Sequence, residues 1–397
     1  MSYSRITRVV LINYKSIAPA NVRLGPLTFL VGPNGAGKSN FIDALLFCRD
    51  ALRTPLDQVF AKRNTNLRSL LHQPPIEPDL VQMRFEFVLE SGQTGFYSFG
   101  IGPHPARGFE VQREDCVLHG PGGRPEQSFE VRSGGLTIQN LSAPVPPAPG
   151  PNRLYLVNAS GIPEFQPVYE LFSGMEFYSP DPATMRVDLD TTGSSDILDT
   201  DGENTAGVLD RLRRTQQDTK ARIDQYLRAI VPGLERVETS EFEFYKLLNF
   251  YMTTSGSLPS KFLASSMSDG TLRALALLVA LFQNAGSDSP ATLIAIEEPE
   301  TGLHPAATAV LLDALREASE SVQVIVTSHS SDLLDNSEIR SDELRAVYWE
   351  NDGTAVLDID DASRSAMRDR LYTAGELLRM GRLQPASGNK SPTPLSQ

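Results

Sequence analysis

The segment from Gly32 to Ser39 has the residue types and the spacing that hold the phosphates of a nucleotide. It reads Gly32-Pro33-Asn34-Gly35-Ala36-Gly37-Lys38-Ser39, which matches the pattern G-x-x-x-x-G-K-S. Glycines are needed because the backbone N–H groups of such a loop must curl around phosphate oxygens, and side chains would block that approach. We expect Lys38 to bridge the β- and γ-phosphates of ATP and the hydroxyl of Ser39 to ligate Mg²⁺. The predicted ATP site extends from Gly32 to Asn40.

A pair of carboxylates, Glu297 and Glu298, follows the apolar run from Leu293 to Ile296. Carboxylates at the end of a buried strand suit phosphoanhydride hydrolysis. Glu297 would hold the metal ion through its water shell, and Glu298 would polarise the attacking water as a general base. The alternative for the same two residues is an acidic helix cap.

Two further segments contain groups that suit a terminal phosphate. Between Ser266 and Arg273, small residues such as Ser268 and Gly270 precede a long apolar helix. Backbone N–H groups and the Ser268 hydroxyl would therefore face an anion at the positive end of that helix. The second group is His329, which follows a predicted strand. Taken alone, Ser268 is an ordinary helix cap and His329 an ordinary surface or core residue.

Elements at both ends of the chain would position these groups. Apolar runs over 6–13 and 27–31 predict strands, and the second run stops at Gly32, before a helix predicted over 39–52. Later in the chain we expect a helix over 271–282, a strand over 292–296, a helix over 305–318 and a strand over 322–327. Strands that alternate with helices predict an α/β fold with a mainly parallel, covered sheet.

The middle of the chain has a different pattern. Short strand-like runs, such as 81–88 and 95–99, predict an antiparallel β lobe. Prolines predict an exposed, extended connector over 144–151, and small polar residues predict a loop over 181–204. An amphipathic helix is expected over 209–230, with a basic side that is either a solvated face or a nucleic-acid contact. The basic residues are Arg211, Arg213, Arg214, Lys220, Arg222 and Arg228.

These patterns divide the chain into five parts. They are the N-terminal half of the ATPase core with the phosphate loop (1–80), the antiparallel β lobe and linker (81–180), a loop and helical insertion (181–261), the C-terminal half of the core (262–383) and a disordered tail (384–397).

Composition limits the class of protein further. The chain has 397 residues, of which 40% are hydrophobic, so it can bury a large core. It has no run of about 20 apolar residues and no apolar segment near its start, which favours a cytoplasmic protein with no membrane contact. Cys48 and Cys116 are too few for a disulfide scaffold, and we expect both to be buried. The net charge of −13 argues against general coating of nucleic acid, although a local basic groove is compatible with it.

The four motifs, in this order, resemble those of the ATP-binding-cassette (ABC) superfamily, and in particular its branch of RecF, structural-maintenance-of-chromosomes (SMC) and OLD-family ATPases. The run from Val9 to Ile17 is similar to the opening strand and N-F-K-S-type turn of that branch. The segments 267–271, 297–305 and 373–381 resemble the stand-alone AAA_21/AAA_15 group of predicted ATPases. Most relatives have Asp where this chain has Glu297, which leaves the metal coordination open.

The resemblance implies roles that the residues alone do not. The loop with Ser268 and Gly270 would be the signature loop, which reaches the γ-phosphate of the ATP held by the opposite subunit of a homodimer. His329 would sense the γ-phosphate. Gln73 is the best candidate for the glutamine that couples the γ-phosphate and metal to the helical lobe. His304 would be either a dimer contact or a helix cap.

The resemblance also implies a function. We expect an ATPase that dimerises on ATP and acts as a switch or motor for a partner such as a nuclease, in DNA repair, recombination or anti-phage defence, with DNA as a possible ligand. A regulatory scaffold that sequesters a toxin or nuclease is the alternative. A transporter subunit is less favoured, because transporters usually have Gly at position 269 and Asp at position 297. We interpret Asp358-Ile359-Asp360 as a chance likeness to the metal-binding pair of OLD-family nucleases.

Overall fold

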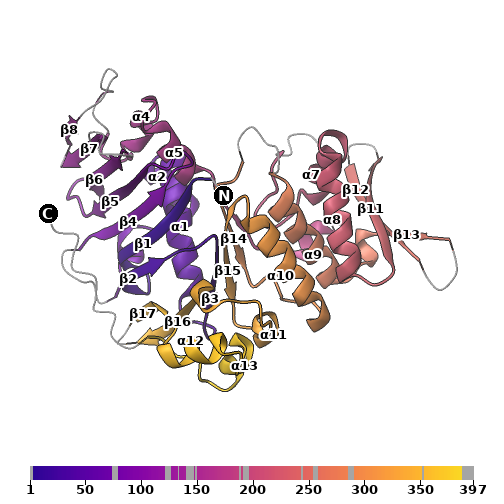
Figure 1. Ribbon diagram of the computed structural model, residues 1–397. Coiled ribbons are helices and arrows are strands. Elements are labelled where there is room, and N and C mark those ends of the chain that lie inside the picture. The colour runs from indigo at the N-terminus through magenta and orange to yellow at the C-terminus, as the bar shows by residue number, and fades with distance from the viewer. Residues whose placement is uncertain are drawn as a thin grey trace.

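The computed structural model describes residues 3–73, 79–120, 127–132, 134–139, 147, 150–186, 189–190, 196–242, 245–253, 258–284, 290–350 and 353–386. The expected connector over 144–151 falls largely outside these residues, and so does the tail from 387 onward. The described residues form three sheets with helices packed between them (Figure 1).

The central sheet has six strands in the order β17-β16-β3-β15-β14-β9. Neighbouring strands are parallel except for β16 and β17. The strands are β3 (Leu27–Val31), β9 (Met175–Tyr178), β14 (Leu293–Glu297), β15 (Gln323–Ser328), β16 (Leu344–Glu350) and β17 (Gly353–Asp358). The prediction of a mainly parallel sheet is confirmed. Because β3, β14 and β15 run in the same direction, the functional segments that follow them meet at one sheet edge.

Helices cover both faces of this sheet. Helix α1 (Lys38–Arg53) packs on one face, and α9 (Asp269–Phe282) and α10 (Pro305–Ser319) pack on the other. Alternate residues of β14 serve the two cores, since Leu293 and Ala295 face the α1 side while Ile294 and Ile296 face the α9 side. Shorter helices complete the core: α11 (Ser331–Leu334), α12 (Asp361–Arg368) and α13 (Ala374–Arg379), with the 3-10 turns Ala264–Ser266 and Ser341–Glu343.

The antiparallel lobe is a seven-stranded sheet, and it draws on more of the chain than the expected 81–180 segment. Two strands from the first 80 residues join it, because β1 pairs with β4, while β9 joins the central sheet instead. The strands are β1 (Arg5–Tyr14), β2 (Ile17–Arg23), β4 (Val81–Val88), β5 (Thr94–Gly102), β6 (Glu110–His119), β7 (Gln127–Arg132) and β8 (Gly135–Gln139). Helices α2 (Leu56–Lys62), α3 (Leu67–Leu70), α4 (Leu156–Ala159) and α5 (Gln166–Ser173) lie beside it.

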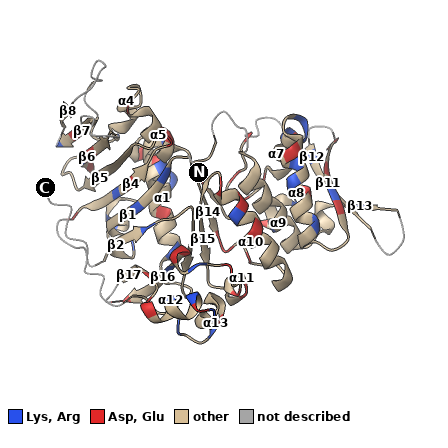
Figure 2. Ribbon diagram, in the orientation of Figure 1, with Lys and Arg blue, Asp and Glu red and all other residues tan. Residues whose placement is uncertain are grey.

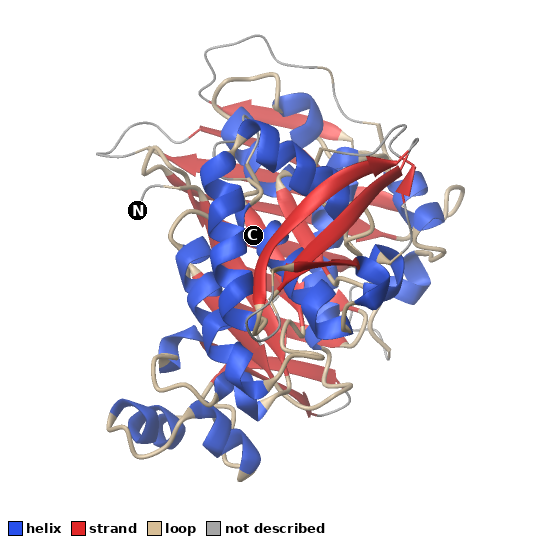
Figure 3. Cartoon of the chain, turned by 90° about the vertical axis from the view of Figure 1, so that its right-hand side faces the viewer, coloured by secondary structure: helices blue, strands red, loops and turns tan. Residues whose placement is uncertain are grey.

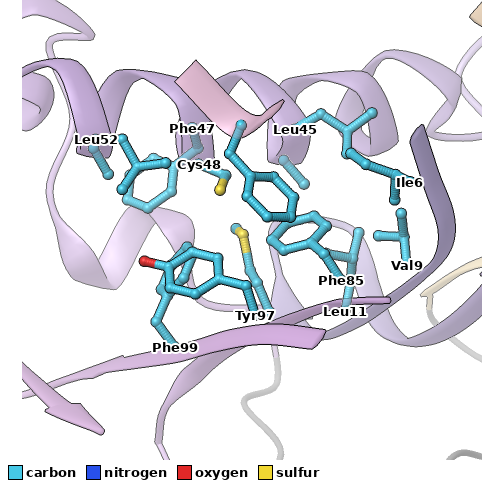
Figure 4. Close-up of a cluster of buried hydrophobic side chains, with 14 of the residues drawn as sticks. Ile6, Val9, Leu11, Leu45, Phe47, Cys48, Leu52, Phe85, Tyr97 and Phe99 are labelled. Carbon is cyan, nitrogen blue, oxygen red and sulfur yellow. The ribbon is translucent and has the colours of Figure 1, made fainter. Parts of the chain in front are cut away.

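This sheet and α1 share a core rich in aromatic side chains (Figure 4). Phe47 and Cys48 of α1 point toward Phe85, Tyr97 and Phe99 of the sheet, and all five are nearly or fully buried. Both cysteines of the chain are free and buried, as expected. The phosphate loop is thus attached to a helix that a large apolar cluster holds in place.

The insertion between residues 181 and 261 contains helices, as expected, and also an antiparallel sheet that the sequence did not predict. It has short elements α6 (Pro182–Met185) and β10 (Leu189–Asp190), then α7 (Thr205–Thr215), α8 (Gln217–Ile230), β11 (Leu234–Phe242), β12 (Tyr245–Met252) and β13 (Ser260–Leu263). The last three strands and β10 form a third, antiparallel sheet on the outer side of this lobe (Figures 1 and 3). The expected single helix over 209–230 is interrupted at Gln216, whose φ of −143° is not helical.

Four of the six basic residues on α7 and α8 are paired with acidic neighbours, which Figure 2 shows beside these helices. Arg213 and Arg214 both pair with Asp210, Lys220 pairs with Asp224, and Arg222 pairs with Glu317. These pairs favour the simpler expectation of a solvated helix face over a nucleic-acid contact.

Glu114 of β6 is a fully buried carboxyl that anchors the start of α4. It accepts hydrogen bonds from the backbone N–H groups of Tyr155 at 2.5 Å and Leu156 at 2.8 Å, and from the Tyr97 hydroxyl at 2.9 Å. Burial outweighs these bonds and raises its pKa to about 7. Folding therefore favours the protonated form, and this contribution to stability is present below the ordinary pKa and is lost as the pH rises through about 7.

We predict that the free energy of unfolding has a component of roughly 3 kcal/mol that is lost between about pH 4.5 and 8. Glu114→Gln should remove this pH dependence, because an amide does not titrate. Denaturant unfolding at several pH values measures the free energy of unfolding as a function of pH. The same pH dependence for the wild type and the variant would contradict the assignment.

Candidate active site

The phosphate loop connects β3 to α1, as the sequence predicts. Pro33, Asn34 and Gly35 are exposed, and so is Ser39 in the first turn of α1. Lys38 is buried, with 6% of its surface exposed, and its Nζ donates to the backbone oxygens of Gly32 at 2.8 Å and Pro33 at 3.0 Å. The lysine is therefore held inside the curl of the loop, where the phosphates of a nucleotide would lie.

A threonine from the C-terminal hairpin supports this loop. The Thr354 hydroxyl donates to the backbone oxygen of Ala36 at 2.9 Å and lies 2.7 Å from the hydroxyl of Ser16, which accepts a hydrogen bond from Asn40. Gly37 adopts a φ of 99°, and a Cβ on it would lie 2.0 Å from the Thr354 hydroxyl. Glycine is thus required at position 37 both by its backbone conformation and by the space available.

We predict that Gly37→Ala abolishes detectable ATP binding, because the added methyl group must displace either the loop or β17. The left-handed backbone conformation at position 37 alone costs a residue with a Cβ about 1–2 kcal/mol. Equilibrium binding of a fluorescent ATP analogue measures the effect. Gly92→Ala is the matched control, since φ is also positive there, a Cβ would meet nothing within 4 Å, and the residue lies outside the phosphate loop. Equal affinities of the two variants would contradict the steric argument.

The acidic pair lies where β14 ends, beside the end of β15. Glu298 has a φ of 42°, which a non-glycine residue rarely adopts, and its backbone N–H donates to the backbone oxygen of Thr327 at 3.0 Å. Its Oε1 lies 2.8 Å from Nδ1 of His329. The structure therefore brings together Glu298 and His329, which are 31 residues apart in the sequence.

The carboxylates at the end of β14 interact electrostatically with Lys38 of the phosphate loop. Burial lowers the pKa of Lys38, while the nearby carboxylates of Glu298, Glu300 and Glu297 act in the opposite direction. These carboxylates are thus close enough to Lys38 to interact with it. The lysine, the acidic residues and the histidine form one constellation at the sheet edge.

Glu300 and Ser328, which lie within two of the predicted segments, also belong to this constellation. The Ser328 hydroxyl donates to Oε1 of Glu300 at 2.5 Å and accepts from the backbone N–H of Ser330 at 3.0 Å. Glu300 is 7% exposed, and burial raises its pKa. The two hydrogen bonds fix the chain on both sides of His329.

The segment expected to be the signature loop lies at the start of α9. Ser268 is exposed and caps the helix, since its hydroxyl accepts from the backbone N–H of Thr271. A Cβ on Gly270 would lie 2.2 Å from the backbone oxygen of Gly302, so this helix end packs tightly against the segment after Glu300. His304 caps α10 by accepting from the backbone N–H of Ala306.

Gln73 is exposed and follows α3. The neighbouring His72 contacts the backbone oxygen of Lys15, which precedes the serine that bonds to Thr354. Gln73 therefore lies toward that side of the phosphate loop, and its coupling role stays a prediction. On the other side of the site, β9 pairs with β14, the strand that ends at Glu297. The chain leaves β9 at Ser179, so the segment that begins there starts close to Glu297.

A phosphate loop, an acidic strand end and a histidine on neighbouring strands of a covered, mainly parallel sheet define a P-loop ATPase of the ABC type. The chain belongs to the AAA_21 family, described as "AAA domain, putative AbiEii toxin, Type IV TA system". The family profile matches residues 27–101 and 188–335, more than half of the chain.

Solved structures show the same fold. An SMC head bound to the C-winged-helix domain of ScpA aligns with a TM-score of 0.54 and 15% identity, covering 89% of this chain and 96% of that one. An SMC head with an extended coiled coil, bound to the C-terminal domain of ScpA derived from Pyrococcus furiosus, gives 0.54 and 14%, covering 93% and 99%.

A curated relative is the structural maintenance of chromosomes protein 1 of Schizosaccharomyces pombe, which is 27% identical over 125 residues. The match covers 28% of this chain and spans only 10% of that protein's length. None of the helices in the described part of the chain has the length and apolar character required to span a bilayer.

Proposed function

We propose that this ATPase hydrolyses MgATP in pockets formed by two copies of the chain. One observation carries the proposal: Ser268 is exposed at the start of α9, which packs on the face of the central sheet opposite to α1 and its phosphate loop. A serine placed in this way suits the nucleotide of a second copy rather than that of its own chain. ATP binding would close the dimer, and hydrolysis would open it.

The proposed roles follow from the positions of the side chains. Lys38 neutralises the β- and γ-phosphates, and Glu298 activates the attacking water, held in place by its contact with His329. His329 in turn contacts the γ-phosphate. The geometry fits this division, because the imidazole and the carboxylate lie at the same sheet edge as the lysine.

Mg²⁺ fits the residues at this edge. Magnesium usually keeps several waters and binds through one or two protein groups together with phosphate oxygens. The exposed hydroxyl of Ser39 would be a direct ligand, and Glu297, at the end of β14, would act through water. The ion neutralises charge on the transferred phosphoryl group when bound.

We further propose that the dimer acts as a switch for a separate effector protein such as a nuclease. The solved SMC heads are bound to ScpA domains, which supports partner binding by heads of this fold. The ion pairs on α7 and α8 do not favour that surface as a DNA contact. Repair, recombination and anti-phage defence are the settings in which such a switch would act.

Light scattering of the purified chain tests the dimer. We expect a mass near the 43.5 kDa of one chain with ADP and near twice that mass with a slowly hydrolysed ATP analogue and Mg²⁺. A single-chain mass with every nucleotide would refute the proposal. Affinity capture from the native cell in the presence of ATP would then identify the effector.

A further inference from the structure

Arg186, directly after α6, contacts the start of α9 on both sides of Ser268. Its Nη2 donates to the backbone oxygen of Met267 at 2.9 Å and to Oδ1 of Asp269 at 2.5 Å. Met267 and Asp269 are the residues immediately before and after Ser268. One guanidinium group thus fixes the residues that flank the serine, in the planar and directional way that suits Arg.

The segment that carries Arg186 also contacts the other end of α9. Tyr178 is the last residue of β9, and its hydroxyl accepts a hydrogen bond from Nε2 of Gln283 at 2.8 Å, directly after the end of α9. Gln283 is fully buried, and its Oε1 accepts from the backbone N–H of Leu198 at 2.8 Å. Helix α9 is therefore held at both ends by residues 178–186.

This segment begins beside the acidic residues. Tyr178 pairs in register with Ile296, the residue before Glu297. The chain then leaves the sheet, where the backbone N–H groups of Ser179 and Asp181 donate to the oxygens of Thr200 and Asp201. Residues 178–186 therefore lead directly from the acidic strand end to Arg186, which contacts the loop that contains Ser268.

The Arg186–Asp269 ion pair is too exposed to contribute much to folding. The side chains are 30% and 71% exposed, and pairs of this kind contribute little to stability. Its effect is on orientation, because Ser268 itself is exposed and bonds only within its own helix turn among the described contacts. A loop that must meet a nucleotide on another molecule gains from being held in place beforehand.

We propose that Arg186 is a positioning residue that holds the Ser268 loop ready for the ATP of the second copy and ties that loop to β9 beside Glu297. The inference rests on the proposed function, because it assigns Ser268 to a pocket shared between two copies. Beyond that function, the proposal names Arg186 as the residue that sets the orientation of the Ser268 loop. It also names residues 178–186 as the segment that joins this loop to the strand beside Glu297.

The test compares Arg186→Met with Arg368→Met in the full chain. Arg368 is an exposed arginine paired with Asp369, far along the sequence from α9, so it controls for the loss of one surface ion pair. For Arg186→Met we expect an unchanged Kd of the single chain for ATP and an unfolding temperature within about 2 °C of the wild type. We expect kcat and the ATP-dependent dimer affinity to fall about tenfold to a hundredfold, because a displacement of about 1 Å in a group that contacts the substrate can lower a rate by a factor of about 100. The control should change neither.

Amide hydrogen exchange of residues 264–272 provides a readout that does not depend on dimerisation. Arg186→Met should speed exchange in this segment, and the control should not. Unchanged exchange, or normal kcat and dimer affinity, would overturn the inference. A variant that loses single-chain ATP affinity or stability would also overturn it, because Arg186 would then be a general structural residue. If the wild type itself never dimerises, the proposed function fails, while the exchange result still decides whether Arg186 holds the loop.

Discussion

Glu298→Gln should bind ATP with nearly normal affinity and hydrolyse it at least about a hundred times more slowly than the wild type. The amide keeps the size of the side chain and a hydrogen-bond partner for His329, which lies 2.8 Å from Oε1, but it does not accept a proton from water. Because hydrolysis would open the dimer, the variant should accumulate as an ATP-bound dimer. Single-turnover hydrolysis and light scattering in the presence of ATP measure the two effects.

Glu297→Gln is the matched control for this experiment. It removes the same charge one residue earlier, at the position assigned to the water shell of the metal. We expect its defect to lessen when the Mg²⁺ concentration is raised, whereas the defect of Glu298→Gln should not respond. A Glu298→Gln variant with more than a tenth of wild-type kcat would remove that residue as the base.

Lys38→Ala should lose ATP binding rather than catalysis alone. Lys38 is the buried cation inside the phosphate loop, and loss of one partner of a buried charge pair costs about 2–5 kcal/mol. This cost corresponds to a Kd at least about 30 times higher. Titration with a fluorescent ATP analogue measures it.

The contacts of Lys38 provide an internal control for the fold of this variant. Its Nζ bonds only to backbone oxygens of Gly32 and Pro33 in the described structure, so the core packing of α1 should survive the truncation. We expect the unfolding temperature to change little in the absence of nucleotide. Tight ATP binding by a folded Lys38→Ala variant would contradict the assignment of the phosphate loop.

Local patterns were enough to predict the parts of the site that lie within one segment. The phosphate loop, the acidic strand end and the His329 segment each follow an apolar β-strand pattern, which places them at strand ends. The parallel sheet then brings them together, because the carboxyl ends of parallel strands share one edge. The alternation of strands and helices carries that information, so the sequence predicts both the sheet and the meeting point.

Contacts between distant segments could not be predicted in this way. Thr354 supports the phosphate loop from 318 residues away, and Arg186 reaches Asp269 across 83 residues. Ordinary polar side chains make both contacts, and nothing in their local sequence marks them. Only the packing of the hairpin and of α6 reveals their partners.

Within the insertion, the sequence predicted neither the strands β11–β13 nor the break between α7 and α8. A register shift between Leu234 and Arg236 interrupts the alternation of β11, and its exposed side carries charged residues such as Arg236 and Glu238. A strand with such a bulge does not show the strict period of two that sequence reading relies on. The break at Gln216 is equally hidden, because its neighbours keep helical spacing on both sides.

The most direct test of the shared pocket is to mix two inactive variants. Lys38→Ala removes the phosphate-loop half of the pocket, and Ser268→Arg blocks the half that the second copy would supply. We expect each variant alone to be inactive and an equal mixture to regain ATP hydrolysis, because a mixed dimer contains one intact pocket. A mixture that stays as inactive as its components, although an affinity tag on one variant co-purifies the untagged other variant in the presence of ATP, would contradict the claim that two copies build each active site.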